Sequence, residues 1–287
     1  MEEYKWYSGR YDRVFKEVML KKSNNDMLTM LLEYILKIKI NNITILNNEK
    51  LMTNVHIRSQ RLDLNLDTNI GKINVEVNST DETYIPYRNF AFLTDIYSHD
   101  VLVGHEYDSN KQYIQINLSY GLSKNRKDVE IYKMRDIDGR TYLDNFILYN
   151  INMDNYTNKI NEIDTKDLKD DIILIMLAQD RDILIKLAKK YKVVAKYMKE
   201  VDEVNKNPEF REYMSKEEDD MKIKNSLIKE ATENGFNKGI EQGIEQGIEQ
   251  RNVEIVNNLL NTDMSISEIS KIVNLPEEEI IKIKDAK

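Results

Sequence analysis

The stretch RLDLNLDTNIGKINVEVN, residues 61–78, decides the fold of this chain. Two runs alternate between apolar and polar residues on either side of a turn signal at Asn69-Ile70-Gly71. The apolar positions are Leu62, Leu64 and Leu66, then Ile73, Val75 and Val77; the polar positions are Asp63, Asn65 and Asp67, then Asn74, Glu76 and Asn78. Alternation with a period of two is typical of strands whose two faces meet different surroundings. The stretch therefore predicts a β-hairpin with one apolar face and one polar face.

The polar face of this hairpin carries the candidate chemistry. Neighbouring strands lie about 4.8 Å apart, so Asp63 on the first strand and Glu76 on the second can share an oxygen-rich site of the kind that Mg²⁺ prefers. A metal ion held there can polarise a phosphoryl oxygen and lower the pKa of a bound water, as phosphodiester hydrolysis requires. A solvated face of a half-exposed sheet gives the same alternation, so the spacing alone leaves both interpretations open.

The flanking segments predict an α/β core around the hairpin. Helical spacing of apolar residues indicates a helix over residues 11–38, broken near residues 23–25, and a second helix over residues 84–103. Residues 55–57 are β-like, and residues 112–120 alternate as a further strand. Residues 129–154 indicate an added hairpin that turns at Asp138-Gly139. Residues 166–229 are helical and charged, with their clearest break at Asn207-Pro208.

The order of short motifs adds a resemblance. Arg61-Leu62-Asp63 followed by residues 73–78 looks like the Asp…Glu-x-Lys core of PD-(D/E)XK nucleases. More narrowly, the chain resembles the PD-(D/E)XK nuclease family transposases, also called recombination-promoting nucleases. The motifs that agree in order are the opening Asp12-Arg13-Val14-Phe15-Lys16, the two carboxylate strands, the helix with Tyr84 and Arg88, and Gly104-His105-Glu106-Tyr107. The resemblance implies a restriction-endonuclease-like core, a mixed sheet flanked by helices, with a C-terminal helical extension.

The resemblance also implies roles for single residues. Asp63 and Glu76 would ligate Mg²⁺ or Mn²⁺, and position 78 would orient the attacking water. That position is Lys in the wider superfamily and commonly Gln in this branch, but here it is Asn78. Asn is shorter and cannot act as a base, and a misplacement of about 1 Å can cost on the order of 100-fold in rate. Arg61, Arg88 and Lys16 are the candidate DNA contacts.

Each supporting residue also has a structural interpretation. Arg61 fits a salt bridge as well as a phosphate contact, and Lys16 can cap its helix instead of touching DNA. Glu33 is a further candidate metal-side acid, although an exposed helical Glu is the more common explanation. The three histidines have no recognised zinc spacing.

Composition excludes several classes of protein. The 287 residues carry a net charge of -8, which excludes a uniformly basic nucleic-acid binder. Residues 1–128 hold 17 basic and 17 acidic residues, so the acidity lies in the back half and we expect DNA contacts in the front. The absence of cysteine excludes disulfides, thiolate zinc sites and a cysteine nucleophile. The longest apolar run, residues 172–178, is too short to span a bilayer, and no signal peptide is evident, so we expect a cytoplasmic protein without a membrane partner.

Residues 239–250 repeat Gly-Ile-Glu-Gln three times. Four residues advance a helix by about 400°, so the isoleucines form one slowly drifting stripe with the glycines beside it. Each Gly costs about 1 kcal/mol of helix stability against Ala, a cost that close packing against another helix can offset. We expect either a self-associating helix, which would make the chain a homo-oligomer, or a flexible linker. Short helices are predicted over residues 252–260 and from Ser265 and Pro276 onward.

Together these features predict three parts: a nuclease-like domain over residues 1–155, a charged helical region over residues 156–235, and the repeat helix with a terminal helix pair over residues 236–287. The expected function is metal-dependent DNA endonuclease activity linked to recombination, mobile elements or defence against foreign DNA. The alternative is a catalytically degenerate nuclease-fold protein that acts as a DNA-binding or regulatory assembly module. An adaptor for other proteins, built on the acidic helical half, is a third possibility.

Overall fold

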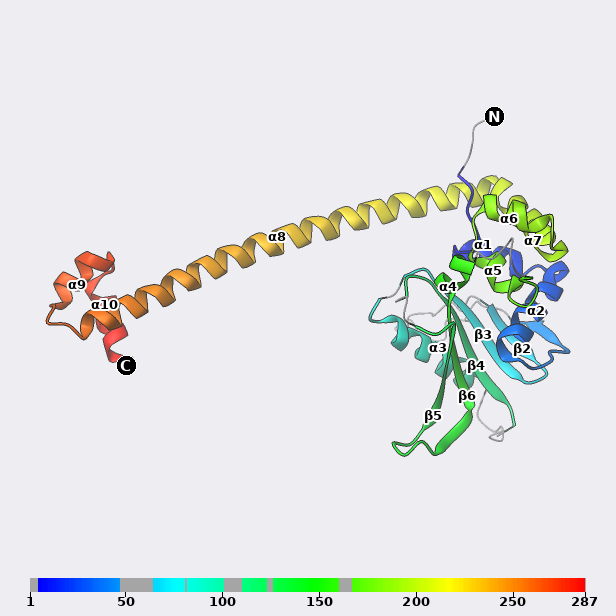
Figure 1. Ribbon diagram of the computed structural model, residues 1–287, viewed down its shortest axis with the longest axis horizontal. Coiled ribbons are helices and arrows are strands. Elements are labelled where there is room, and N and C mark those ends of the chain that lie inside the picture. The colour runs from blue at the N-terminus through cyan, green and yellow to red at the C-terminus, as the bar shows by residue number, and fades with distance from the viewer. Residues whose placement is uncertain are drawn as a thin grey trace. The chain divides into compact units, whose positions relative to one another are not determined.

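The computed structural model describes residues 5–46, 64–80, 82–100, 110–122, 126–159 and 167–286 (Figure 1). The β-like residues 55–57, the motif at residues 104–107, and two of the predicted site residues, Arg61 and Asp63, lie outside the described residues. Contacts divide the chain into two compact units, residues 1–211 and residues 212–287. The division into three parts that the sequence predicts, over residues 1–155, 156–235 and 236–287, stays a prediction.

A mixed six-stranded sheet in the order β1-β2-β3-β4-β6-β5 organises the first unit. Its strands are β1 (Ile43–Ile45), β2 (Leu64–Thr68), β3 (Gly71–Asn78), β4 (Gln112–Ser119), β5 (Val129–Arg135) and β6 (Thr141–Asn152). The pairs β1–β2, β2–β3 and β5–β6 are antiparallel, whereas β3–β4 and β4–β6 are parallel. Both predicted hairpins and the predicted strand over residues 112–120 are confirmed.

A glycine closes the central hairpin. Gly71 has a φ of 139°, a conformation that L side chains rarely adopt. A Cβ at this position would lie 2.0 Å from the carbonyl oxygen of Gln112. The turn signal therefore serves two purposes, since it reverses the chain between β2 and β3 and lets β4 approach the start of β3.

Helices cover both faces of the sheet (Figure 1). In the first unit they are α1 (Asp12–Met19), the 3-10 helix η1 (Lys22–Asn24), α2 (Asn25–Leu36), α3 (Ile85–Asp100), α4 (Met153–Asn158), α5 (Ile172–Ala178), α6 (Arg181–Ala188) and α7 (Lys192–Lys206). The break predicted near residues 23–25 is confirmed by η1. On the apolar face, the Tyr120 hydroxyl donates to the Leu177 carbonyl of α5 at 3.2 Å. The other face meets α3, because Phe92, Leu93 and Ile96 pack against Tyr113 of β4.

The N-terminal segment is attached to α7. The Trp6 indole donates to Asp202 at 2.8 Å, and the side chain of Asn205 bonds the backbone of Tyr7 in both directions, at 2.7 and 2.9 Å. Both ends of the first unit therefore belong to one folded body, so the charged helices after β6 are part of the same structure as the sheet.

The second unit is helical. It contains most of α8 (Pro208–Leu260), followed by α9 (Ile266–Val273) and α10 (Glu277–Asp285). The predicted break at Asn207-Pro208 and the helix start at Ser265, which forms a capping box with Glu268, are confirmed. The separate helix expected over residues 252–260 is wrong, because no proline interrupts the chain there and α8 continues through the repeat. Its end packs against the terminal helices through Val256, Ile269 and Ile280. Within the described ranges, no helix combines the length and apolar character that a membrane span requires.

An ionic cluster joins three helical elements on the apolar side of the sheet. Lys159 lies 2.6 Å and the Tyr34 hydroxyl 2.5 Å from the carboxylate of Asp171. Partial burial opposes ionisation of this carboxyl, but the hydrogen bonds from Lys159 and Tyr34 outweigh it and hold the pKa of Asp171 below its usual range. The depressed pKa contributes stability that is present at neutral pH and is lost as the pH falls through the folded-state pKa.

We expect Asp171→Asn to lower the free energy of unfolding at pH 7 by about 1 kcal/mol. The difference from wild type should shrink below about pH 4, because the unfolded carboxyl then takes up a proton while the folded one is still ionised. Urea unfolding at pH 7 and pH 3 measures both values. Asp170→Asn, at an exposed neighbour, is the control and should change little. An unchanged difference at the two pH values would contradict the role given to this ion pair.

Candidate functional site

The polar positions of the hairpin form a buried row. Asn74, Glu76 and Asn78 on β3 are at most 4% exposed, so the alternative of a solvated face is wrong. In the parallel pairing with β4 they lie opposite Gln115, Asn117 and Ser119, which are also buried. The row is buried because α3 lies over it. The inward positions of α3 recur at helical spacing: Ile85, Asn89, Phe92, Leu93 and Ile96.

Amide side chains orient Glu76. Asn74 Nδ2 donates to Glu76 Oε1 at 2.9 Å and to Gln115 Oε1 at 3.0 Å. Gln115 Nε2 in turn donates to Asn117 Oδ1 at 2.8 Å, and Asn117 Nδ2 donates to the Tyr149 carbonyl at 3.2 Å. The chain of donors runs across three strands, which holds the carboxylate of Glu76 in one orientation.

One side-chain oxygen of this row lacks a hydrogen-bond partner within the described ranges. Asn74 Oδ1 is buried and has no hydrogen-bond partner among the described residues. A buried polar atom left unpaired costs about 1–3 kcal/mol, and burial of a carboxylate such as that of Glu76 is costly unless donors or a cation accompany it. Carboxylate and amide oxygens are the ligands that Mg²⁺ and Mn²⁺ accept. The residues around Glu76 therefore fit a divalent metal ion.

Asn78 and Arg88 are brought together. A terminal nitrogen of Arg88 donates to Asn78 Oδ1, and Asn78 Nδ2 donates to Ser119 Oγ at 3.3 Å. Ser119 Oγ donates onward to Asn150 Oδ1 at 2.7 Å. The guanidinium of Arg88 also lies about 6 Å from the ring centres of Tyr84 and Phe92. Arg88 is thus fixed over the polar row from α3, with Asn78 as its anchor.

The remaining predicted residues are separated from this row or lie outside the described ranges. β2 is described from Leu64, which pairs with Val75, the residue before Glu76. Lys16 is half-buried on α1, a helix on the sheet side opposite α3. Glu33 accepts from the backbone N–H of Ile40 at 2.9 Å and thereby holds the segment that follows α2. Across the described ranges, no three His, Cys, Asp or Glu side chains gather as a metal site.

Sequence reasoning missed half of the buried row. Gln115, Asn117 and Ser119 alternate with Ile114, Ile116 and Leu118, which is the same period-two signal as in the hairpin. That alternation was sufficient to predict a strand with one polar face. What could not be read from it is that this face lies beside Glu76, because strand pairing is set by tertiary structure.

Comparison with known proteins agrees with this arrangement. The family model described as PD-(D/E)XK nuclease family transposase matches residues 9–231. The chain belongs to this family. The match spans the sheet and the helices through α7, and it includes the first part of α8. Among curated proteins and among solved structures, no match was found.

Family membership confirms the resemblance and the predicted fold class, a mixed sheet flanked by helices with a helical C-terminal region. The residues predicted to match the Glu-x-Lys core, Glu76 and Asn78, lie on β3. The roles of these two residues stay predictions.

We expect Arg88→Met to destabilise the first unit by about 1–3 kcal/mol, because it leaves the buried Oδ1 of Asn78 without this donor. Methionine keeps much of the apolar stem of arginine, so packing against Phe92 changes little. Chemical denaturation measures the loss. Arg140→Met, at a side chain that is 81% exposed, is the control and should stay within about 0.5 kcal/mol of wild type. Equal stability of the two variants would show that the contact between Arg88 and Asn78 does not stabilise the fold.

Proposed function

We propose that this chain is a divalent-metal-dependent DNA endonuclease that hydrolyses phosphodiester bonds in recombination, in the movement of mobile elements or in defence against foreign DNA. Membership of the PD-(D/E)XK nuclease family transposases supports a nuclease-related, transposase-associated function. The observation that carries the proposal is the buried carboxylate of Glu76 beside Asn74 Oδ1, which has no hydrogen-bond partner among the residues that the structure describes. Carboxylate and amide oxygens at one place are the ligands that a divalent metal ion accepts.

In this proposal Asp63 and Glu76 hold Mg²⁺ or Mn²⁺. Asp63 directly precedes Leu64, whose partner Val75 directly precedes Glu76. The bound metal ion would supply a polarised phosphoryl oxygen and a water of lowered pKa. The amide of Asn74 orients the carboxylate of Glu76.

Asn78 has a changed role in the same proposal. Both polar atoms of its side chain are engaged, one by Arg88 and the other by Ser119. Asn78 therefore positions the guanidinium of Arg88 for a phosphate, in place of the base function of a lysine. Arg61 and Lys16 are proposed as further DNA contacts.

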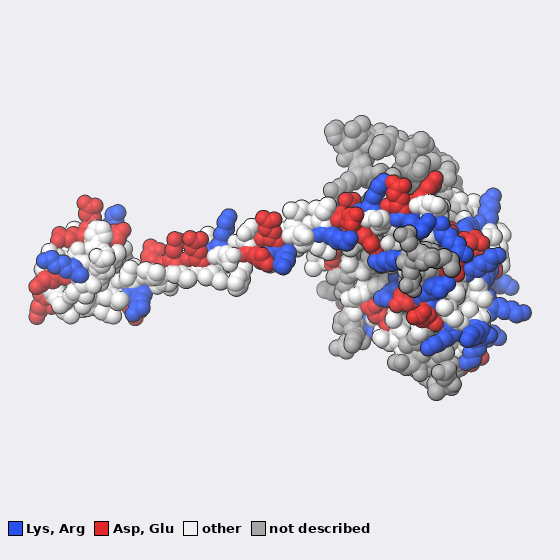
Figure 2. All heavy atoms as spheres, turned by 90° about the horizontal axis from the view of Figure 1, so that it is seen from above, with Lys and Arg blue, Asp and Glu red and all other residues white. Residues whose placement is uncertain are grey.

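The charge of the surface is compatible with DNA binding by the first unit. Figure 2 shows Lys and Arg side chains spread among acidic ones over the larger body, whereas acidic side chains dominate much of the visible α8 and terminal helices. The same contrast follows from the sequence, where residues 1–128 are neutral and the negative charge lies behind them. A neutral surface repels the phosphate backbone less than an acidic one does.

The cytoplasmic location stays a prediction.

The hydrogen bonds of Asn78 to Arg88 and Ser119 also favour a second candidate function. Because Arg88 and Ser119 already engage both polar atoms of its side chain, Asn78 does not orient a water as lysine or glutamine would at this position. A protein that keeps the fold and binds DNA without cutting it, as a regulatory or assembly module, fits that observation. Cleavage is the property that separates the two candidates.

We expect Glu76→Gln to abolish nicking of supercoiled plasmid DNA in the presence of Mg²⁺ or Mn²⁺, with a loss of at least about 100-fold, because the amide cannot supply a carboxylate ligand. Gel assays of homogeneous full-length protein measure the rate. Glu17→Gln, on the exposed side of α1, is the matched control and should cut like wild type. If wild type and Glu76→Gln give the same rate, the enzyme proposal fails and the binding-only candidate replaces it.

We further propose that a second copy of this chain packs against the repeat segment of α8. Ile240, Ile244 and Ile248 are each about half exposed along this helix. A Cβ built on any of Gly239, Gly243 and Gly247 meets no atom within 4 Å, so contacts in the described part of the chain do not explain these glycines. An identical helix presents the same four-residue spacing, and glycines at that spacing permit close approach of the two backbones.

Replacing Ile240, Ile244 and Ile248 together by Ser should convert the full-length chain from an oligomer to a monomer, because the apolar stripe that the partner covers is lost. Analytical ultracentrifugation measures the mass. The control replaces Gln242, Gln246 and Gln250 by Ser, which inserts the same number of serines on other sides of the helix and should leave the oligomer intact. A monomeric wild type, or an unchanged oligomer in the isoleucine variant, would rule out association through this stripe.

A further inference from the structure

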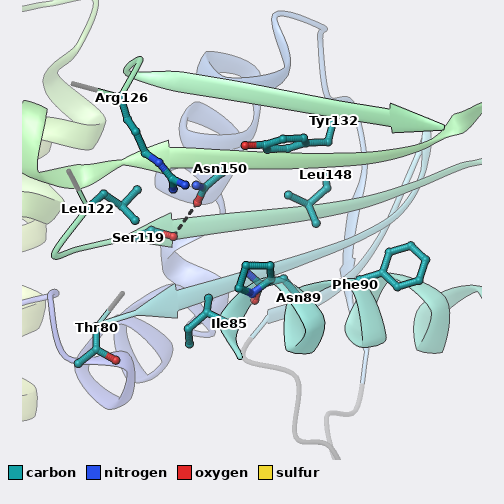
Figure 3. Close-up of a pocket in the computed structure, with 11 residues that line it drawn as sticks. Thr80, Ile85, Asn89, Phe90, Ser119, Leu122, Arg126, Tyr132, Leu148 and Asn150 are labelled. Carbon is teal, nitrogen blue, oxygen red and sulfur yellow. Dashed lines mark hydrogen bonds between the residues drawn. The ribbon is translucent and has the colours of Figure 1, made fainter. Parts of the chain in front are cut away.

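A pocket of about 280 Å³ opens beside the polar row (Figure 3). It lies between α3 and the β5–β6 hairpin, where the parallel strands β3 and β4 end. Its polar and aromatic lining comes from Asn89, Phe90, Ser119, Arg126, Tyr132 and Asn150. Ligand pockets range from about 300 to 1,000 Å³, so this volume suits one small ring system.

Two aromatic side chains stand on opposite walls of this pocket. Phe90 comes from α3 on one side and Tyr132 from β5 on the other, as Figure 3 shows. Each is about half exposed, at 52% and 51%, although both are large and partly apolar. Leu148 lines the wall between them. Walls of this kind accept a flat heterocycle, because every base has a π-face that stacks on an aromatic ring.

The interior of the pocket holds an unsatisfied acceptor. Asn89 is 4% exposed, and its Oδ1 is buried without a hydrogen-bond partner in the described part of the chain. An amide oxygen in that state accepts from an N–H group on the edge of a ring. The amide nitrogen of Asn150, which also lines the pocket, donates to Glu130 over a long contact of 3.4 Å, whereas its Oδ1 accepts from Ser119 at 2.7 Å. These groups can pair with the polar edge of a base.

A cation lies at the same pocket. The side chain of Arg126 is 42% exposed and lies 3.9 Å from Glu130, which is near the limit of an ion pair. Exposed pairs of this kind contribute little to stability, so Arg126 can exchange Glu130 for a phosphate. The lining thus combines stacking surfaces, an edge acceptor and an anion-binding group, which are the three parts that one nucleotide requires.

The pocket is connected to the candidate active site. Arg88 donates to Asn78, Asn78 donates to Ser119, and Ser119 donates to Asn150, which lines the pocket. Asn78 stands two residues from Glu76 on the same face of β3. If the pocket holds one nucleotide, the phosphodiester backbone of the same DNA strand would therefore pass close to Glu76.

We propose that this pocket receives one unstacked nucleotide of the DNA substrate, with its base between Phe90 and Tyr132, its edge on Asn89 and its phosphate on Arg126. This inference rests on the proposed function, since it assumes that DNA is the substrate. Withdrawing a base from a duplex costs a few kcal/mol, and least for a mismatched or single-stranded base. The pocket consequently makes the protein select DNA whose bases are already unpaired.

The test measures binding of fluorescein-labelled oligonucleotides by anisotropy, with the full-length Glu76→Gln chain and Mg²⁺ so that the DNA stays intact. The probes are a single strand, a fully paired duplex and the same duplex with one mismatch. We expect the single strand and the mismatched duplex to bind more tightly than the paired duplex. Tyr132→Ala and Phe90→Ala should each weaken binding of the single strand about tenfold and remove the preference for the mismatch.

Two further variants separate stacking from structure. Tyr132→Phe keeps the ring and should bind like the parent chain, whereas Tyr142→Ala removes a tyrosine that is 75% exposed on β6, away from the pocket lining, and should change affinity less than twofold. Asn89→Leu removes the edge acceptor and should weaken binding of the single strand.

The outcomes distinguish this inference from the proposed function. If the chain binds DNA but Tyr132→Ala and Phe90→Ala behave like Tyr142→Ala, the pocket does not hold a base and the inference is overturned while the nuclease proposal stands. If only the single strand responds to the variants, the pocket takes a base from single-stranded DNA and not from a mismatched duplex. If the chain binds none of the probes, both the DNA substrate and the pocket assignment are overturned.

Discussion

The parallel pairing of β3 with β4 is the constraint on which the rest of this structure depends. It sets Asn74, Glu76 and Asn78 opposite Gln115, Asn117 and Ser119, so six polar side chains share one face of the sheet. That face is then covered by α3, and polar groups buried in this way must bond to one another or destabilise the fold. The donor chain from Asn74 to Tyr149 meets most of this requirement, whereas Asn74 Oδ1 has no partner within the described part of the chain.

The same constraint explains why α3 serves both folding and function. Its apolar residues Phe92, Leu93 and Ile96 pack on Tyr113 near the start of β4, whereas Arg88 and Asn89 meet the polar ends of the strands. One end of α3 thus covers the core, and the other end carries the guanidinium of Arg88 and the amide of Asn89. A site built on a packed helix and a central sheet is held more precisely than one built on loops, which suits a reaction that depends on the position of a phosphate.

Asn78 separates this chain from the usual PD-(D/E)XK pattern, and the structure assigns it contacts that a lysine would not make. An amide can accept from Arg88 and donate to Ser119 at the same time, whereas an ammonium group can only donate. Position 78 thus carries a neutral amide, and the positive charge beside it belongs to Arg88 of α3.

Local pattern determined a large part of this protein. Period-two alternation predicted β2, β3 and β4, helical spacing predicted α1 to α3, and Asn207-Pro208 predicted where α8 begins, because each depends on residues close in sequence. Alternation and motif order likewise singled out Glu76, and its role as a metal ligand together with Asp63 stays a prediction. Only the tertiary structure decided that the polar face is buried, that Arg88 binds Asn78, and that Asn89 and Asn150 meet at one pocket. The reason is physical: strand register and helix docking depend on packing between segments distant in sequence, and alternation within one strand is the same whether water or a helix covers it.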